Sequence, residues 1–452
     1  MMQYVCPPGS HLQGIGEEKG KVGAVLHYDA IFIGLVGGAL IRLIVNQKLC
    51  LRRNLTFTFR FYMITKIAVR QQDVKNKQQS YKITIIHPSV GVNWSGGSEI
   101  FAIEMTRNLA AFFDVELLSG AKCGEYSRIA GGIPRAYTYN FINQPLIKNI
   151  LYRFANHPDI IIEHLTNFFP CVIHCLTNST DLIFPCNDYG GLAIAAVVRA
   201  IKGIPILYTE HNNLLAEGKC LKRNLCFSPD HLVVSNHKTA AFVRNIKSTQ
   251  TVSIIPNGVD LQQFTPEGTK IDFGLKKPVV LCVASLNRNN HKRVDLVINA
   301  VSCLPQASLL LCGDGLDKEY FQTRGDKLLG SNRFKICMFP FQRMPEVYRS
   351  ADIFTLASIN EPFGFAYIEA MASGLPIVTT NDEMRRYIIG NSGILCDVTN
   401  SQIYADALTK VLQENWQKKS LNNAFRFSWD NIALKYRDVI LETIKRKQEQ
   451  AG

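Results

Sequence analysis

The chain has 452 residues, of which 47% are hydrophobic and 19% charged, so its composition excludes a disordered protein and allows two or three domains. Its thirteen cysteines show no paired spacing and lie mostly in apolar runs, which indicates buried free thiols in a reducing compartment. The formal net charge is +13. A basic excess is usually a solvated surface, and nothing else in the sequence indicates nucleic-acid binding.

Residues 1–80 are predicted to be a basic N-terminal extension, with eleven Lys and Arg against four Asp and Glu. The apolar run from Ala30 to Val45 is interrupted by Arg42 and is shorter than the roughly 20 apolar residues of a membrane span. The segment also lacks the pattern of a signal peptide. Three interpretations stay open: a weak membrane anchor, an unstructured extension, or upstream reading frame before a start at Met63. The last two are favoured, and we expect a cytoplasmic protein with at most peripheral contact to the inner face of a membrane.

From residue 81 the sequence alternates between strand and helix patterns. Tyr81 to Pro88 is predicted to be a buried strand, a glycine-rich loop follows, and apolar spacing predicts a helix over 98–113. Further strands are expected over 114–118, 159–162, 181–185 and 204–208. Strands that alternate with helices form a doubly wound parallel sheet, and we assign residues 81–265 to this first α/β domain.

The same pattern restarts near residue 278 and predicts a second α/β domain over 266–428. A helix is expected over 293–303, and a long final helix over 429–447, within the segment 429–452. Two facing domains of this kind would form a cleft at the carboxyl ends of their sheets, where open α/β sheets bind ligands. The expected strands of this domain are 278–283, 308–312, 333–337, 353–356 and 377–380.

The most informative pattern lies between Glu361 and Pro376, where two carboxylates stand eight residues apart. A strand-like run precedes Glu361, and the helix that contains Glu369 is predicted to begin at Gly364. The free amides at a helix N-terminus and the helix dipole favour a phosphate, which assigns Gly364, Phe365 and Ala366 to donor binding. Glu369 could accept hydrogen bonds from a ribose. Glu361 would then face the group that the phosphate carries, as in a nucleotide-sugar site.

This run resembles the E-x7-E motif of the retaining GT-B glycosyltransferases, the group 1 family of mannosyl-, glucosyl- and sucrose-type transferases. The resemblance covers roughly residues 81–445. It implies two facing Rossmann-like domains, acceptor domain first and donor domain second, with the C-terminal helix crossing back to the first. It implies transfer of a hexose from a nucleotide diphosphate sugar to an acceptor hydroxyl, with Glu361 on the sugar and Glu369 on the ribose. It also implies that no metal or other cofactor is bound, and no Asp-x-Asp element follows a strand here.

In the first domain two motifs resemble those of the family. Gly96-Gly97 followed by Glu99 resembles the loop that contacts the donor phosphate or the acceptor, so Gly97 is assigned to donor binding. His211 follows a strand and resembles the strand-end histidine near the reaction centre, which makes it a catalytic candidate. The run from Ser253 to Phe264 is also typical of the family, and we expect it to be structural at the join of the domains.

In the second domain the family usually places an Arg just after the first strand and a Lys six or seven residues later, both holding the diphosphate. Lys292 matches the Lys and is a catalytic candidate, but Ser285 stands where the Arg would be. Arg288 or Arg293 could supply the missing charge, and Arg288 is assigned to donor binding. Gly313 resembles the glycine turn beside the donor.

Two other classes of function stay open at this stage. A nucleotide-sugar epimerase on the same fold would need further acid and base carboxylates, and a non-catalytic sugar-nucleotide-binding protein would tolerate Ser285. The acceptor could be a glycan, a lipid-linked sugar or a small molecule, and the sequence does not identify the sugar or the base of the donor. Cys171, His174 and Cys175 lack a second cluster at zinc spacing, so we expect helix packing and no metal site.

Overall fold

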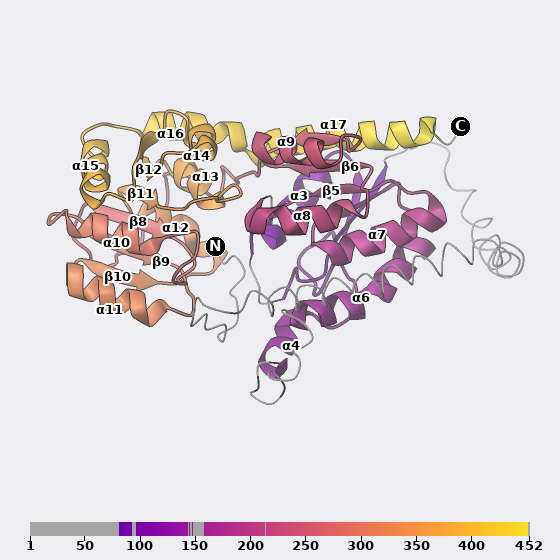
Figure 1. The fold of residues 1–452 in the computed structure, drawn as a ribbon, viewed down its shortest axis with the longest axis horizontal. Coiled ribbons are helices and arrows are strands. Elements are labelled where there is room, and N and C mark those ends of the chain that lie inside the picture. The colour runs from indigo at the N-terminus through magenta and orange to yellow at the C-terminus, as the bar shows by residue number, and fades with distance from the viewer. Residues whose placement is uncertain are drawn as a thin grey trace, which may run out of the picture.

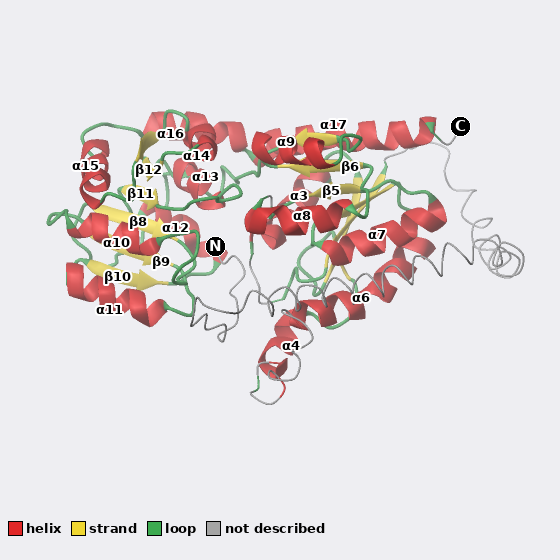
Figure 2. Cartoon of the chain, viewed as in Figure 1, coloured by secondary structure: helices red, strands yellow, loops and turns green. Residues whose placement is uncertain are grey.

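The computed structural model describes residues 81–92, 96–142, 158–212 and 214–450, together with residues 144 and 147. It has two α/β domains joined side by side (Figures 1 and 2). The predicted extension over residues 1–80, and its possible membrane contact, lie outside the described residues.

Within its described residues, the N-terminal domain holds seven parallel strands in two adjoining sheets of order β3-β2-β1-β4 and β5-β6-β7. A parallel bridge between Ile183 and Ile206 joins the sheets, so the strands follow one another in a single layer. The strands are β1 Lys82–His87, β2 Asp114–Ser119, β3 Ser127–Ile129, β4 Leu182–Pro185, β5 Leu207–Thr209, β6 His231–Val234 and β7 Val252–Ile254. The helical elements are α3 Gly97–Leu109, α4 Arg135–Ile142, α6 Pro158–Thr177, α7 Tyr189–Lys202, η1 Leu215–Gly218, α8 Lys219–Leu225 and α9 His237–Ile246.

The second domain has one parallel sheet of order β10-β9-β8-β11-β12-β13. Its central strands are apolar on both faces and fully buried, as expected where helices cover both sides of a sheet. The strands are β8 Val279–Val283, β9 Ser308–Cys312, β10 Phe334–Cys337, β11 Ile353–Leu356, β12 Ile377–Thr380 and β13 Gly393–Cys396. The helical elements are α10 Val294–Ser302, α11 Lys318–Leu329, η2 Phe341–Arg343, α12 Met344–Arg349, α13 Phe365–Ala372, α14 Glu383–Ile389, α15 Ser401–Val411, α16 Gln417–Ala424 and η3 Phe425–Phe427.

The last helix, α17 (Trp429–Glu449), leaves the second domain and runs along the first (Figure 1). Its Tyr436 ring stacks on Phe184 at 5.7 Å between ring centroids, and Phe101 meets both Tyr436 and Trp429 edge-on. The buried Tyr436 hydroxyl shares a 3.0 Å hydrogen bond with Thr209 Oγ1. The aromatic face of α17 therefore forms part of the core of the N-terminal domain.

The predicted α/β fold with two Rossmann-like domains is confirmed, but one predicted strand is wrong. Asp159 to Ile162 lies in the first turns of α6, because its isoleucines belong to a longer apolar run that continues to Thr177. Cys171 and Cys175 of this helix are buried, and His174 Nε2 lies 3.0 Å from Glu116 Oε1. Among the described residues no group of His, Cys, Asp or Glu side chains is arranged to hold a metal.

Within the described residues, α6 is the one helix that is long and apolar enough to cross a membrane by length and composition. Of the 18-residue apolar stretch of α6 that meets this criterion, 28% is buried inside the protein. Length and composition alone are weak grounds for a membrane span, since a core helix of a soluble protein has the same properties.

The Tyr436–Thr209 hydrogen bond predicts a measurable contribution of α17 to stability. We expect Tyr436→Phe to lower the free energy of unfolding by about 0.5–1.5 kcal/mol, because Thr209 loses a buried partner. Denaturant unfolding measures the change. Tyr387→Phe is the matched control, since Tyr387 is exposed, and it should shift the midpoint much less. Equal shifts in the two variants would contradict the role assigned to α17.

Candidate active site

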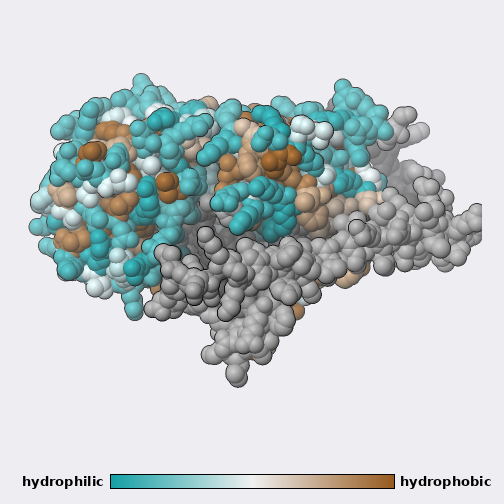
Figure 3. Space-filling view, viewed as in Figure 1, coloured by the Kyte–Doolittle hydropathy of each residue, from teal (hydrophilic) through white to brown (hydrophobic). Residues whose placement is uncertain are grey.

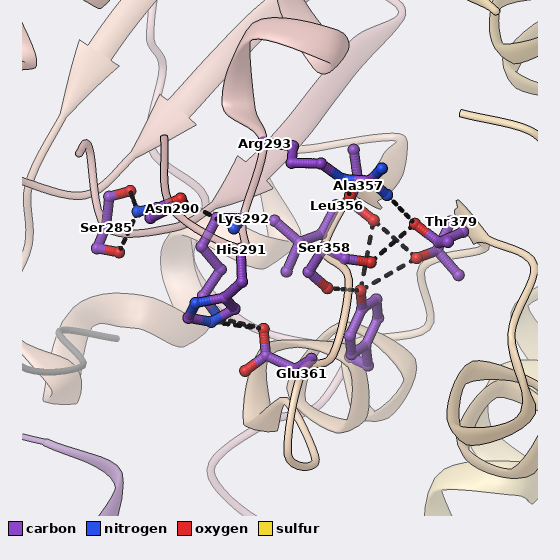
Figure 4. A network of polar contacts seen from close by, with 12 residues as sticks. Ser285, Asn290, His291, Lys292, Arg293, Leu356, Ala357, Ser358, Glu361 and Thr379 are labelled. Atoms are coloured by element: carbon purple, nitrogen blue, oxygen red, sulfur yellow. Dashed lines mark hydrogen bonds and ion pairs between the residues drawn. The ribbon is translucent and has the colours of Figure 1, made fainter. Parts of the chain in front are cut away.

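A buried ion pair joins the loops that follow β8 and β11 at the carboxyl edge of the second sheet. Lys292 Nζ donates to Glu361 Oε2 at 2.5 Å, and the two side chains are 8% and 0% exposed. His291 Nε2 lies 3.5 Å from the same carboxylate oxygen (Figure 4). Burial by itself raises the pKa of Glu361, but Lys292 and His291 outweigh it and hold the pKa well below its usual range. Glu361 is therefore ionised at neutral pH.

The Lys292 backbone is fixed by the neighbouring Asn290. The Asn290 amide donates to Ser285 Oγ at 3.3 Å, and its oxygen accepts from the Lys292 backbone N–H at 2.9 Å. Ser285 is buried in the loop just after β8, in the position where the family resemblance leads one to expect an arginine. The Asn290–Ser285 hydrogen bond, between two uncharged side chains, thus holds the loop that carries Lys292.

The two arginines of this loop, Arg288 and Arg293, make their contacts away from the ion pair. The Arg288 guanidinium stacks over the Tyr320 ring of α11 at 4.2 Å. Arg293 Nε donates to the Ala357 carbonyl at 2.7 Å, and its Nη2 donates to Thr380 Oγ1 at 3.2 Å, so Arg293 ties the loop after β11 to β12 (Figure 4). The assignment of Arg288 to the donor remains a prediction.

A cation that the sequence reasoning missed lies on the other side of Glu361. Arg385 of α14 is almost fully buried, and its Nη1 donates to the Glu361 carbonyl at 3.2 Å. Asp382, the N-cap of α14, holds the same guanidinium and also accepts from the Arg385 N–H at 3.0 Å. A capping Asp three residues before an Arg was the available signal, but it is common at helix starts.

The Gly364–Ala366 segment opens α13 beside this pair. Gly364 has φ of 91°, and a side chain there would collide with the Tyr367 ring 2.7 Å away, so only glycine fits this entry to the helix. Across the join of the domains, a Cβ on Gly97 would lie 3.3 Å from the Phe365 ring. The structure thus brings together Gly97, at the start of α3, and Phe365, at the start of α13, two residues assigned to donor binding from separate motifs.

Glu369, the second carboxylate of the motif, is buried. Tyr348 Oη donates to Glu369 Oε2 at 2.7 Å. Burial raises the pKa of Glu369 to about 7, although the Tyr348 hydrogen bond lowers it in part. Glu369 lines a cavity between the domains. The lining also includes Ile100, Glu104, Gly258, Val259, Asp260, Gln263, Phe264, Phe341, Phe365 and Trp429.

His211 lies just after β5, at the carboxyl edge of the first sheet. Its ring meets Phe101 of α3 edge-on at 4.8 Å, and burial, with His87 nearby, lowers its pKa to about 4. The preceding Glu210 accepts from the Asn212 N–H at 2.8 Å and from Asn224 Nδ2 at 3.0 Å. These bonds fix the turn on which His211 stands, and the sequence reasoning had not assigned Glu210 a role.

Gly313, in the loop after β9, packs against the backbone of the loop after β8. A Cβ on Gly313 would lie 1.9 Å from the Ala284 carbonyl oxygen, so no larger residue fits without movement of the backbone. The Leu286 N–H donates to the Asp314 carbonyl at 2.9 Å beside it. The predicted turn therefore supports the loop that leads to Lys292, and its contact with a donor remains a prediction.

Comparisons with known proteins agree with this architecture. Residues 266–426 match the family described as Glycosyl transferases group 1, and residues 95–263 match Glycosyltransferase Family 4. The chain belongs to the group 1 glycosyltransferases. The chain is 26% identical over 284 residues to a D-inositol 3-phosphate glycosyltransferase of Corynebacterium urealyticum, an alignment of 53% of this chain and 66% of that protein. The chain thus spans slightly less than two thirds of that relative.

Solved structures show that the chain has the GT-B fold. Sucrose-phosphate synthase from Thermosynechococcus elongatus is 17% identical with a TM-score of 0.62, over 82% of this chain and 100% of that one. Anabaena Alr3699/HepE in complex with UDP-glucose is 19% identical with a TM-score of 0.58, over 81% and 99%. The predicted family and fold are therefore confirmed.

Because the Lys292–Glu361 pair is buried, we expect the loss of the lysine alone to cost more stability than the loss of both charges. Lys292→Met should destabilise the fold by about 3–5 kcal/mol, because Glu361 is left as a buried charge without its main partner. Adding Glu361→Gln to that variant should recover much of the loss. Denaturant unfolding of both single variants and the double variant measures the coupling. Additive losses would contradict a direct interaction of the two charges.

The burial of Glu369 predicts that the stability of the protein depends on pH. Its pKa is raised from 4.5 to about 7 in the folded state. The folded state therefore keeps a proton that the unfolded state loses between these values. Ionisation of Glu369 then lowers stability as pH rises through this window, by at most about 3 kcal/mol.

We expect Glu369→Gln to keep the Tyr348 hydrogen bond and to remove this pH dependence. The variant should be more stable than the wild type at pH 8 and close to it at pH 4.5. Unfolding free energies of both proteins across this range give the difference curve. A difference that does not change with pH would contradict the raised pKa.

Proposed function

We propose that this protein is a transferase that moves a hexosyl group from a nucleoside diphosphate sugar to an acceptor hydroxyl with retention of configuration at the anomeric carbon. The observation that carries the proposal is the Lys292–Glu361 pair in the loops beside the N-terminus of α13. A cation and a helix N-terminus suit a diphosphate, and an ionised carboxylate suits sugar hydroxyls. The epimerase and the non-catalytic binding protein are the competing functions.

The donor diphosphate would lie against Lys292 and the amides of Gly364, Phe365 and Ala366. Negative charge grows on the diphosphate as its bond to the anomeric carbon breaks, and preorganised positive groups lower the energy of that state. Lys292 would then be shared between Glu361 and the phosphate. We propose that these groups take the place of a bound metal ion.

The two carboxylates of the E-x7-E motif would bind different parts of the donor. Glu361 is ionised, so it would accept hydrogen bonds from the hydroxyls of the sugar and would not act as a proton donor. Glu369 lines the cavity between the domains together with the rings of Phe341 and Phe365. The ribose would share the Glu369 carboxylate with Tyr348, and this arrangement supports the assignment of the motif.

The acceptor would approach from the N-terminal domain, past Gly97 and His211. At neutral pH the His211 ring is uncharged because its pKa is about 4, so it would contact a hydroxyl without adding charge. A glycan, a lipid-linked sugar or a small molecule could supply that hydroxyl. The HepE complex with UDP-glucose makes UDP-hexoses the first donors to test.

A transfer assay tests the proposal. The protein is incubated with labelled UDP-hexoses and a panel of sugar acceptors, and the released nucleoside diphosphate and the labelled product are quantified. NMR of the product should show the anomeric configuration of the donor. Lys292→Gln should lower turnover on the order of 100- to 1000-fold, because one preorganised cation is lost. A chelator should leave the wild type active.

Lys277→Gln is the matched control for charge removal. Lys277 pairs with Asp352 at 2.9 Å at the amino end of the sheet, far along β8 from the site, and its loss should leave turnover unchanged. Conversion of the sugar without an acceptor would indicate an epimerase. Donor binding without product would indicate a binding protein. Full turnover in Lys292→Gln, or a metal requirement, would refute the mechanism.

A further inference from the structure

The outer face of α6 lacks the charged residues that a solvent-facing helix normally carries. Leu165, Phe169 and Ile173 stand one turn apart and are 53%, 64% and 58% exposed. The sequence from Leu165 to Ile173 contains no charged side chain. An exposed apolar stripe of this length usually marks an interaction surface.

The neighbouring α4 extends this apolar surface. Tyr137 and Phe141 stand one turn apart on α4 and are both exposed, as is Ile133 just before the helix. The Ile133 N–H donates to Thr166 Oγ1 of α6 at 2.9 Å, so the start of α4 is held against α6. The two helices lie together along one edge of the N-terminal domain (Figure 1). We call the exposed apolar side chains of α4 and α6, with Ile133, the apolar face.

The opposite side of α6 is fixed to the sheet, so this helix would lie along a surface and not cross it. Glu163 Oε1 accepts from Ser89 Oγ at 2.7 Å near the first turns of α6, and His174 contacts Glu116 at 3.0 Å in its last turn. Cys171 and Cys175 are packed in the core. A partner can therefore reach only the outer side, as in helices that lie in a membrane interface.

The distribution of charged residues along the chain indicates the chemistry of the partner. The described chain begins at β1 beside the end of α6, where the Asp181 N–H donates to the Lys82 carbonyl at 2.8 Å. Residues 1–80, which precede this point, carry eleven Lys and Arg against four Asp and Glu. The basic excess thus joins the domain at one end of the apolar face. Apolar and aromatic side chains beside a basic segment are the combination that binds anionic lipid.

We propose that the apolar face of α4 and α6 docks on an anionic lipid bilayer. On the second domain, hydrophilic residues cover most of the near side, with apolar residues scattered among them (Figure 3). Docking would also hold the site near the lipid, because α4 begins at Arg135, whose Nη2 pairs at 2.5 Å with Glu99 of α3. The acceptor would then be held at the membrane. This consequence rests on the proposed function, whereas the docking itself does not.

Vesicle flotation with the full chain tests the docking without donor or acceptor. We expect binding to vesicles of phosphatidylcholine with 30% phosphatidylglycerol, and weaker binding to phosphatidylcholine alone. Phe169→Glu with Ile173→Glu should lower the partition coefficient at least tenfold, since each buried apolar side chain contributes about that factor. Ile403→Glu with Leu412→Glu is the matched control. These residues are 46% and 39% exposed on the second domain, and the control should bind like the wild type.

Circular dichroism and thermal unfolding check that both double variants are folded. Equal binding of the wild type and the Phe169→Glu, Ile173→Glu variant would overturn the proposal, as would failure of the wild type to bind anionic vesicles. Light scattering provides a separate reading. A wild-type dimer that the same variant makes monomeric, without any binding to vesicles, would identify a second copy of the chain as the partner and refute the lipid.

Discussion

The architecture of the site depends on one buried ion pair between two loops of the same sheet. Lys292 follows β8 and Glu361 follows β11, two neighbouring strands that end at the same edge. Neither charge could be buried alone without a large cost. Each loop therefore needs the other in place, and Asn290 and Arg385 hold the backbone on either side. Glu361 stands just before Gly364, through which the chain enters α13.

Parallel topology explains why residues far apart in the sequence meet. The carboxyl ends of the strands of each sheet face the join of the domains, so loops after β1, β5, β8 and β11 converge there. The closeness of Gly97 to Phe365 shows how small the space between the two helix starts is. Glycine at that position lets the two domains approach each other. A site formed in this way depends on the relative placement of the domains as much as on either domain alone.

The fold could be predicted from the sequence because apolar strand runs, glycine turns and helical spacing agreed with one another. Asp159 to Ile162 failed because β-branched residues favour strands locally, whereas the pattern that decided the structure extended over 20 residues of α6. The structure brings the two candidates Lys292 and Glu361 together, but their pairing could not be predicted, since sequence spacing does not report contacts between loops. The burial of Glu369 could not be predicted either, because its hydrogen-bond partner Tyr348 belongs to a different helix. Arg385 lies in no motif that the sequence reasoning used.

The chain passes between the domains twice, and the two passages are hydrogen bonded to each other. The Val259 N–H donates to the Phe427 carbonyl at 2.7 Å, and the Trp429 N–H donates to the Val259 carbonyl at 3.2 Å. Because the two connectors are bonded to each other, neither can shift without the other. A change in the relative placement of the domains, and with it of Gly97 and Phe365, would have to be taken up by the backbone at Val259 and Ser428.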